Sequence, residues 1–151
     1  DKRFGPGHLQ SAVSMNNLAS VLAGEGNFAE AEQLERKSIA IFAQKLPNSA
    51  ELAAAYANLA GYLMAKNAPT EAVEWLRRAI MADEASGGAG TLQEAADLAS
   101  LAQALRPSDA SGSERALRRA LSIYENRLGA ASEQAQRVRN ALAERQSGSK
   151  E

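Results

Sequence analysis

The sequence predicts an all-α protein built from repeated helical hairpins, and three observations support this fold class. A period of 41 residues relates Asn17-Leu18-Ala19 to Asn58-Leu59-Ala60, and Glu30-Ala31 to Glu71-Ala72. Within each period the apolar residues fall twice at helical spacing, with Gly, Asn or Pro between the two stripes. Alanine recurs throughout and only 5% of the residues are aromatic, which favours closely packed helices over strands.

Composition argues against several kinds of partner. The chain has 151 residues, 45% of them apolar, which is enough to bury a core. Its 17 basic and 18 acidic residues leave a formal charge of −1, which offers no general attraction for nucleic acid. No segment approaches the roughly 20 apolar residues that a membrane span needs, and there is no signal peptide pattern. The absence of Cys excludes disulfides and thiolate metal sites and fits a cytoplasmic location, which we expect.

The two stripes of each period place the helices. In the first copy, Met15, Leu18, Ala19 and Leu22 form one stripe, and a second follows the break at Gly24 to Asn27. The predicted helices cover residues 9–25, 28–45, 49–66, 69–85, 91–105, 112–128 and 132–146. Residues 1–8 form a connector and residues 147–151 a disordered tail. Because no polar capping helix precedes the first hairpin, we expect further repeats or another domain upstream.

The first copy resembles one repeat of the kinesin-light-chain class of tetratricopeptide repeats. The resemblance rests on Asn16-Asn17-Leu18-Ala19, on the segment from Gly26 to Leu34, and on the segment from Lys37 to Ile41. Phe4-Gly5-Pro6-Gly7-His8 is similar to the connector of this family, whose histidine is a structural loop residue. The likeness covers residues 4–146 and weakens toward the third copy.

This resemblance implies an α-solenoid of three tetratricopeptide-like helical hairpins plus a C-terminal capping helix, seven helices in all. The implied repeats lie at about 9–45, 49–85 and 91–128 within a solenoid of residues 9–146, with the capping helix at 132–146. A single hairpin cannot bury both of its stripes, so neighbouring hairpins must stack. We expect Leu18 and Leu59 to be buried, so that replacing either with Ala would cost about 2–5 kcal/mol.

In relatives, the first helices of successive hairpins line a concave groove, where an Asn commonly hydrogen-bonds the backbone of a bound peptide. The resemblance therefore implies a groove for an extended or helical peptide. Its predicted binding residues are Asn16, Asn17, Ser20, Asn58, Gly61, Met64, Gln93, Asp97, Ser100 and Gln103. Because the groove positions are small and nearly uncharged, we expect backbone contacts and shallow apolar pockets rather than a clamp for a carboxylate. The alternative is that Asn17 and Asn58 only form hydrogen bonds within their hairpins.

The favoured function is a scaffold that binds a protein or peptide, and two alternatives remain. One is self-association through the open N-terminal hairpin, and the other is a sensor region of a larger signalling protein. An enzyme is not expected, since no Ser/His/Asp, Cys/His or paired inward carboxylates converge. With a single His and no Cys, neither a zinc site nor another cofactor is expected.

Three conspicuous features have structural interpretations. Trp75 falls on the inner stripe of a helix and is expected in the core. Arg77-Arg78 and Arg118-Arg119 recur with the period, which indicates solvated outer faces. Gly87-Gly88-Ala89-Gly90 follows no strand, so it is expected to be a flexible connector and not a phosphate-binding loop.

Overall fold

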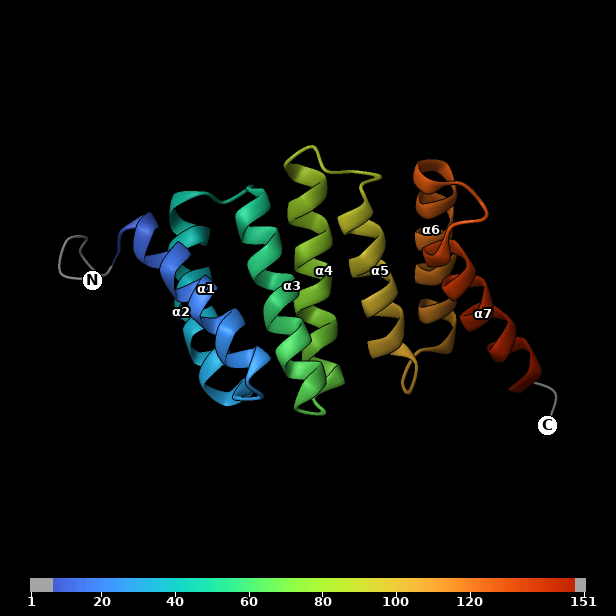
Figure 1. The fold of residues 1–151 in the computed structure, drawn as a ribbon, viewed down its shortest axis with the longest axis horizontal. Coiled ribbons are helices and arrows are strands. Elements are labelled where there is room, and N and C mark those ends of the chain that lie inside the picture. Colours follow the sequence, from blue (N-terminus) through green and yellow to red (C-terminus); the bar gives the residue numbers. More distant parts are fainter. Residues whose placement is uncertain (1–6, 149–151) are drawn as a thin grey trace. The chain divides into compact units, whose positions relative to one another are not determined.

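The computed structural model describes residues 7–148, and over this part the chain forms seven α-helices and no strand (Figure 1). The helices are α1 (Leu9–Gly24), α2 (Phe28–Lys45), α3 (Ala50–Ala65), α4 (Pro69–Ala85), α5 (Leu92–Leu105), α6 (Ala110–Leu128) and α7 (Glu133–Gly148). The predicted all-α repeat fold is therefore confirmed. The chain divides into two compact units, Asp1–Gly87 with α1 to α4 and Gly88–Glu151 with α5 to α7.

The ends of the observed helices lie within two residues of the predicted ends. The helix predicted over 112–128 begins earlier, at Ala110, because Asp109 caps it: its Oδ1 accepts a hydrogen bond from the backbone N–H of Gly112 at 2.7 Å. At the other end of the chain, α7 continues to Gly148, so residues 147–148 are helical and not part of a disordered tail. Residues 149–151, and residues 1–6 of the predicted connector, lie outside the described part.

Two caps illustrate how sequence signals fix the helix starts in the first unit. His8 is the N-cap of α1, and its Nδ1 accepts a hydrogen bond from the backbone N–H of Gln10 at 3.2 Å. The connector histidine therefore has a structural contact, as the resemblance implies. Pro69 occupies the first turn of α4, where its missing N–H costs nothing because that donor has no partner within a helix.

The first unit is a stack of two helical hairpins joined through small residues. α1 packs against α2, α3 packs against α4, α2 also packs against α3, and α1 touches α3. The alanines with no exposed surface in this unit are Ala12, Ala19, Ala31, Ala55, Ala60, Ala72 and Ala79. Such residues let backbones approach so closely that the Ser38 hydroxyl of α2 donates to the carbonyl oxygen of Ala12 in α1 at 2.9 Å.

Leu18 does not lie in the core, which corrects the expectation from the repeat. Leu59 has 0% of its surface exposed, whereas Leu18 is 50% exposed. The two leucines hold equivalent positions in the repeat, but α3 has the preceding hairpin beside it and α1 has none among the described residues. The 41-residue period identifies equivalent positions in the repeats, but a side chain at such a position is buried only where a neighbouring hairpin covers it.

Trp75 is half-buried instead of lying fully in the core. The guanidinium carbon of Arg78 lies 4.7 Å from the centre of its ring and that of Arg36 lies 5.5 Å away, both within cation–π range. The ring of Tyr56 is 5.5 Å away. The repeat suggested that both Arg77 and Arg78 would be solvated. Arg77 is exposed beside Glu74, whereas the Arg78 guanidinium also contacts the Trp75 ring.

The second unit packs α5 against α6 and α6 against α7. Glu94 is almost completely buried and accepts a hydrogen bond from the side chain of Arg119, so this arginine is not only a solvated outer residue. On α7, Ala135 and Val138 are buried while most other described side chains are exposed or half-buried. A helix with a single buried stripe suits the end of a stack.

The unequal burial of the two equivalent leucines gives a direct test of the packing. Replacing Leu59 with Ala should lower the free energy of unfolding by about 2–5 kcal/mol, because it removes a fully buried side chain. Replacing Leu18 with Ala should change it by no more than about 0.5 kcal/mol, as at other surface positions. Urea denaturation measures both changes, and equal losses at the two sites would contradict the packing described for α1 and α3.

Candidate functional site

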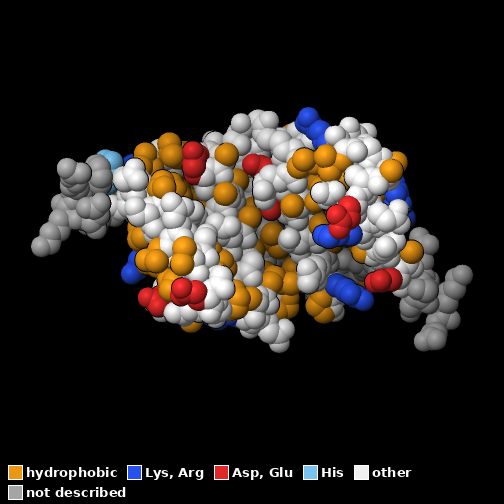
Figure 2. All heavy atoms as spheres, viewed as in Figure 1, with side chains coloured by type: hydrophobic (Ala, Val, Ile, Leu, Met, Phe, Trp, Pro, Cys, Tyr) orange, Lys and Arg blue, Asp and Glu red, His pale blue; other side chains and the backbone are white. Residues whose placement is uncertain are grey.

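The predicted binding residues of the first unit lie on α1 and α3, whose shared surface is nearly free of charge. α1 contains no charged residue and α3 contains only Glu51. Figure 2 shows hydrophobic and uncharged polar atoms covering most of the surface over these helices. Among the predicted residues, Asn17, Ser20 and Gly61 are exposed, and Asn16, Asn58 and Met64 are half-buried.

Two polar pairs join α1 to α3. The side-chain amide of Asn58 donates to Oδ1 of Asn16 at 3.1 Å, and the Ser20 and Tyr62 hydroxyls lie 3.5 Å apart. Asn58 therefore forms its hydrogen bond between hairpins and not within one. Asn17 is exposed, and its side chain makes no hydrogen bond to the described residues. Of the two predicted asparagines, Asn17 is the one whose amide is available to a ligand.

Glu35 is a functional candidate that the sequence pattern did not single out. It lies on α2 with 0% of its surface exposed, and neither carboxyl oxygen makes a hydrogen bond of ordinary geometry within the described part of the chain. The Asn58 amide lies beside it. The sequence does contain a signal for Glu35. The residue one period of 41 later is Leu76, which is buried, so Glu35 is an acid at a position that is apolar in the next copy.

Burial changes the ionisation of this cluster. It raises the pKa of the Glu35 carboxyl to about 8, and the neighbouring Asn58 amide offsets only part of that rise. Glu35 is therefore mostly protonated and neutral at pH 7. Burial also raises the pKa of Tyr62. The hydrogen bond with the Ser20 hydroxyl offsets part of this rise, and the negative charge of an ionised Glu35 adds to it.

The cationic side chains of the first unit that form ion pairs do so away from Glu35. Nζ of Lys66 lies 2.6 Å from a carboxylate oxygen of Glu32, and this contact lowers the pKa of Glu32. Arg36 pairs with Glu32 and with Glu71. No cationic side chain among the described residues lowers the pKa of Glu35. Its charge, once formed, would have no counterion in this unit.

The predicted residues of the second unit lie on α5, but they do not form one surface. Gln93 donates to Oδ1 of Asp97 at 3.0 Å, and Ser100 donates to the carbonyl oxygen of Ala96 at 3.0 Å, so both hydrogen bonds stay within the helix. Asp97 is buried. The pKa of Tyr124 is raised mainly by the burial of Tyr124 and further by the nearby charge of Asp97. Asp97 therefore faces inward, in contrast to the exposed Gln93 and Ser100.

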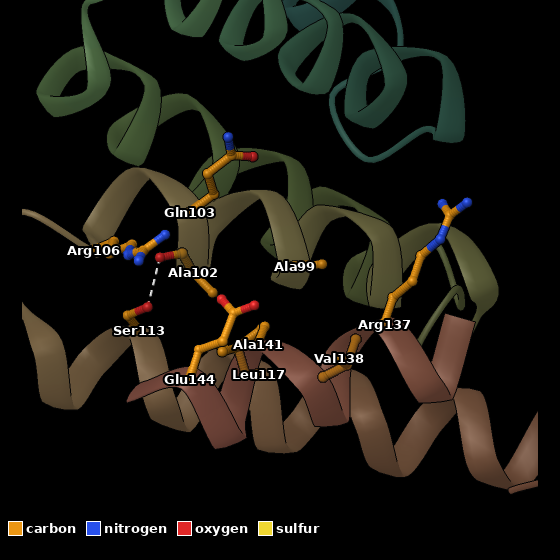
Figure 3. Close-up of a pocket in the computed structure, with 10 residues that line it drawn as sticks. All are labelled: Ala99, Ala102, Gln103, Arg106, Ser113, Leu117, Arg137, Val138, Ala141 and Glu144. Atoms are coloured by element: carbon orange, nitrogen blue, oxygen red, sulfur yellow. Dashed lines mark hydrogen bonds between the residues drawn. The ribbon is translucent and has the colours of Figure 1, made fainter. Parts of the chain in front are cut away.

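A pocket of about 310 Å³ lies between α5, α6 and α7 (Figure 3). It is lined by Ala99, Ala102, Gln103, Arg106, Ser113, Leu117, Arg137, Val138, Ala141 and Glu144. The alanines, Leu117 and Val138 provide an apolar interior, and Figure 3 shows Arg106 and Arg137 at its opposite ends. Gln103 is the predicted binding residue that lines it. The volume is near the lower end for ligand pockets and suits one large apolar side chain.

The groups on these surfaces are mainly amides, hydroxyls and small apolar side chains. Within residues 7–148, no three His, Cys, Asp or Glu residues gather in a way that could hold a metal ion. Over the same residues, no helix has the length and apolar character that crossing a bilayer requires. Amides and hydroxyls can form hydrogen bonds to a backbone, and an apolar pocket can hold an apolar side chain.

Comparison with known proteins agrees with this geometry. The tetratricopeptide repeat family matches residues 11–48 and 52–80. The fold is similar to the kinesin light chain TPR-like repeats of Podosopora anserina, with a TM-score of 0.77 and 21% identity over 91% of this chain and 66% of that one. It is also similar to BtubC (BKLC) from P. vanneervenii, with a TM-score of 0.78 and 22% identity over 91% of this chain and 55% of that one.

A more distant structure has nearly the same extent as this chain. The N-terminal domain of stress-induced protein-1 (STI-1) from C. elegans has a TM-score of 0.69 and 16% identity, over 87% of this chain and 94% of that one. At such identities the likenesses show the fold alone. The chain spans only 66% and 55% of the first two relatives. No curated protein matches the sequence.

The raised pKa of Glu35 predicts an unusual dependence of stability on pH. The carboxyl binds its proton more tightly in the folded state, with a pKa of about 8 against an ordinary value of 4.5, so its contribution to stability falls as pH rises between these values. Glu35→Gln, which mimics the protonated form, should therefore be more stable than the wild type at pH 8.5, by on the order of 4 kcal/mol.

At pH 4.5 the two proteins should have nearly equal stability, because both then carry a neutral side chain at this position. Urea denaturation at the two pH values measures the difference, and Glu32→Gln on the same helix serves as the control because the pKa of Glu32 is lowered. If the gain from Glu35→Gln were the same at both pH values, Glu35 would not be the titrating group.

Proposed function

Since this chain is a tetratricopeptide repeat protein with the fold of kinesin-light-chain repeats, we propose that it is a scaffold that binds an extended or helical segment of a partner protein. Tetratricopeptide repeats generally serve in protein–protein interaction and not in catalysis. The single observation that carries the proposal for this chain is the pocket between α5, α6 and α7, which combines an apolar interior with a polar rim.

In the second unit, the pocket receives an apolar side chain of the partner. Burying a side chain the size of Leu or Phe contributes about 1.5–3 kcal/mol, which makes it an anchor. Gln103 on the rim has an amide that can both donate to and accept from the partner backbone. The exposed Gln93 and Ser100 lie on the same helix and extend this contact. Asp97 is proposed to hold Gln93 in place, since it accepts the hydrogen bond from that amide.

In the first unit, the partner lies over α1 and α3. The exposed Asn17 reads its backbone through both donor and acceptor, and the pairs Asn16–Asn58 and Ser20–Tyr62 form the surface beneath it. Gly61 and Met64 provide a shallow apolar contact. Because no charged side chain stands on α1 and only Glu51 stands on α3, affinity here depends little on surface ion pairs or on salt.

A cytoplasmic location, and membership of a longer signalling protein, remain predictions from the sequence. The kinesin light chain and BtubC structures that share this fold are longer than the present chain. The proposed partner is protein or peptide, with no cofactor, metal, nucleic acid or membrane in the binding event.

A second candidate function is self-association, which one observation favours. Leu18 is 50% exposed and Val21 is 57% exposed, although both are large apolar side chains. They are three residues apart on α1, so they lie on neighbouring positions of one helix face. In the second hairpin the residue equivalent to Leu18 is buried. The proposed occupant of this face is the same face of a second copy, whose α1 also lacks charge.

Blocking the pocket tests the scaffold function. Proteins captured from a cell extract by the wild-type chain supply the partner, and fluorescence anisotropy with a labelled partner segment measures affinity. Ala141→Phe fills the pocket and should weaken binding at least about tenfold, because the anchor side chain loses its site. Ala143→Phe, two residues further on the exposed side of α7, should leave binding unchanged. Equal effects of the two variants would place the partner elsewhere.

The exposed asparagine of α1 gives a second, smaller effect on the same measurement. Asn17→Ala removes a hydrogen bond worth about 0.5–1.5 kcal/mol, which is roughly a 2- to 12-fold loss of affinity. Asn126→Ala, at an exposed asparagine on α6, is the matched control and should bind like the wild type. A loss with Asn126→Ala and none with Asn17→Ala would mean that the partner avoids α1.

Sedimentation equilibrium over a range of protein concentrations tests self-association. If two copies pair through Leu18 and Val21, the average mass of the wild type should rise with concentration toward that of a dimer. Leu18→Glu should keep the protein monomeric at all concentrations, because it would bury a carboxylate against an apolar face. A wild type that stays monomeric, or a Leu18→Glu variant that dimerises like the wild type, would exclude this face as the contact.

A further inference from the structure

The first unit contains a buried acid without a counterion directly beneath the proposed binding surface. We propose that this surface holds a subsite for a lysine side chain of the partner, whose ammonium group displaces the Asn16–Asn58 hydrogen bond and pairs with the Glu35 carboxylate. This inference rests on the proposed scaffold function and adds the chemistry of one residue of the bound segment.

The buried carboxyl of Glu35 is not fully hydrogen-bonded. Its side chain is completely buried, and the nearby Asn58 amide lowers its pKa only in part, because neither carboxyl oxygen has a hydrogen bond of ordinary geometry within residues 7–144. A buried polar group without a partner costs free energy that an incoming donor can recover. An ammonium group brings three donors and a charge, so it satisfies the carboxyl more completely than a neutral donor would.

Glu35 stands at a repeat position that is apolar in the later copies. The residues one and two periods later are Leu76 and Leu117, and Leu117 lines the pocket between α5, α6 and α7. Asn58 corresponds in the same way to Ala141 of that pocket, since both stand directly before a Leu-Ala pair of the repeat. The position that forms an apolar pocket in the second unit is thus occupied by an acid and an amide in the first.

The groups that act on the Glu35 carboxyl within the described residues include no cation. α1 has no titratable residue, and from α3 the group that acts on Glu35 besides the Asn58 amide is the Tyr62 hydroxyl. Of the other titratable residues of α3, Glu51 is exposed and Tyr56 stacks near Trp75. No cation of the described chain acts on Glu35, so a counterion for its ionised form would have to come from a partner.

Binding the ammonium must release a proton. Glu35 is neutral near pH 7, so it gives its proton to solvent when the cation arrives, and the product is a carboxylate paired with the ammonium. By linkage, the apparent affinity should rise about tenfold for each pH unit below the pKa of Glu35 and level off above it. A cation bound at an ordinary surface carboxylate would show no such slope between pH 6 and 8, because that carboxylate is already ionised.

The test uses n-butylamine as a mimic of the lysine side chain, titrated into the isotopically labelled full chain and followed by NMR. We expect saturable shifts of the Asn16 and Asn58 side-chain amides, and movement of the Glu35 carboxyl carbon signal to its ionised position at pH 7. Apparent affinity should increase roughly 50-fold from pH 6 to pH 8. Butyramide, which has similar size and no charge, should produce none of these changes.

Two variants on the same helix complete the design. Glu35→Gln should weaken the butylamine response at least about tenfold, while Glu32→Gln should respond like the wild type because Glu32 already pairs with Lys66. An unchanged response in Glu35→Gln would overturn the proposal. So would an affinity that does not vary with pH, or a wild-type Glu35 signal that stays in its protonated position. This assay needs no partner protein, so its failure is separate from that of the scaffold function, which the Ala141→Phe variant tests.

Discussion

The close approach of α1, α2 and α3 at alanine residues is the constraint on which the first unit depends. Ala12, Ala19, Ala31 and Ala60 have no exposed surface, and at this separation a hydroxyl of α2 reaches a backbone carbonyl of α1. Larger side chains at these positions would force the helices apart. The same closeness excludes water from Glu35, and this exclusion is what raises the pKa of its carboxyl.

This packing divides the first unit into two chemically different sides. Glu32, Arg36, Lys66 and Glu71 form a network of ion pairs that links α2 with α4 and with the end of α3. The side formed by α1 and α3 carries amides, hydroxyls and small apolar residues instead. A surface with few charges and several amides suits recognition of a peptide backbone, and a buried acid beneath it adds selectivity for a cation.

The sequence was sufficient for the helices because their start and stop signals are local. α2 and α4 begin and end at the predicted residues, 28–45 and 69–85, since Asn27 caps one helix and Pro69 starts the other. Burial was less predictable, because it depends on neighbours that a period does not reveal. Leu18 and Leu59 share a repeat position and differ completely in exposure.

The contacts of the predicted site residues could not be read from the repeat for the same reason. Asn17 and Asn58 are equivalent in the repeat, yet Asn58 is bonded to Asn16 and Asn17 is open to solvent. Glu35 could have been found only by aligning it with Leu76, and the pocket beside Gln103 depends on how α7 lies against α5 and α6. Such features arise from the packing of three helices and leave no local signal in the sequence.

The proposed contact surface comprises α1 and α3 in the first unit and the pocket between α5, α6 and α7 in the second. Mapping amide chemical shifts of the labelled chain with a captured partner segment tests it most directly. We expect the largest changes on α1, α3, α5 and α7, around Asn17, Asn58, Gln103 and Ala141. Changes concentrated on the charged outer faces of α2, α4 and α6, with none at these residues, would contradict it.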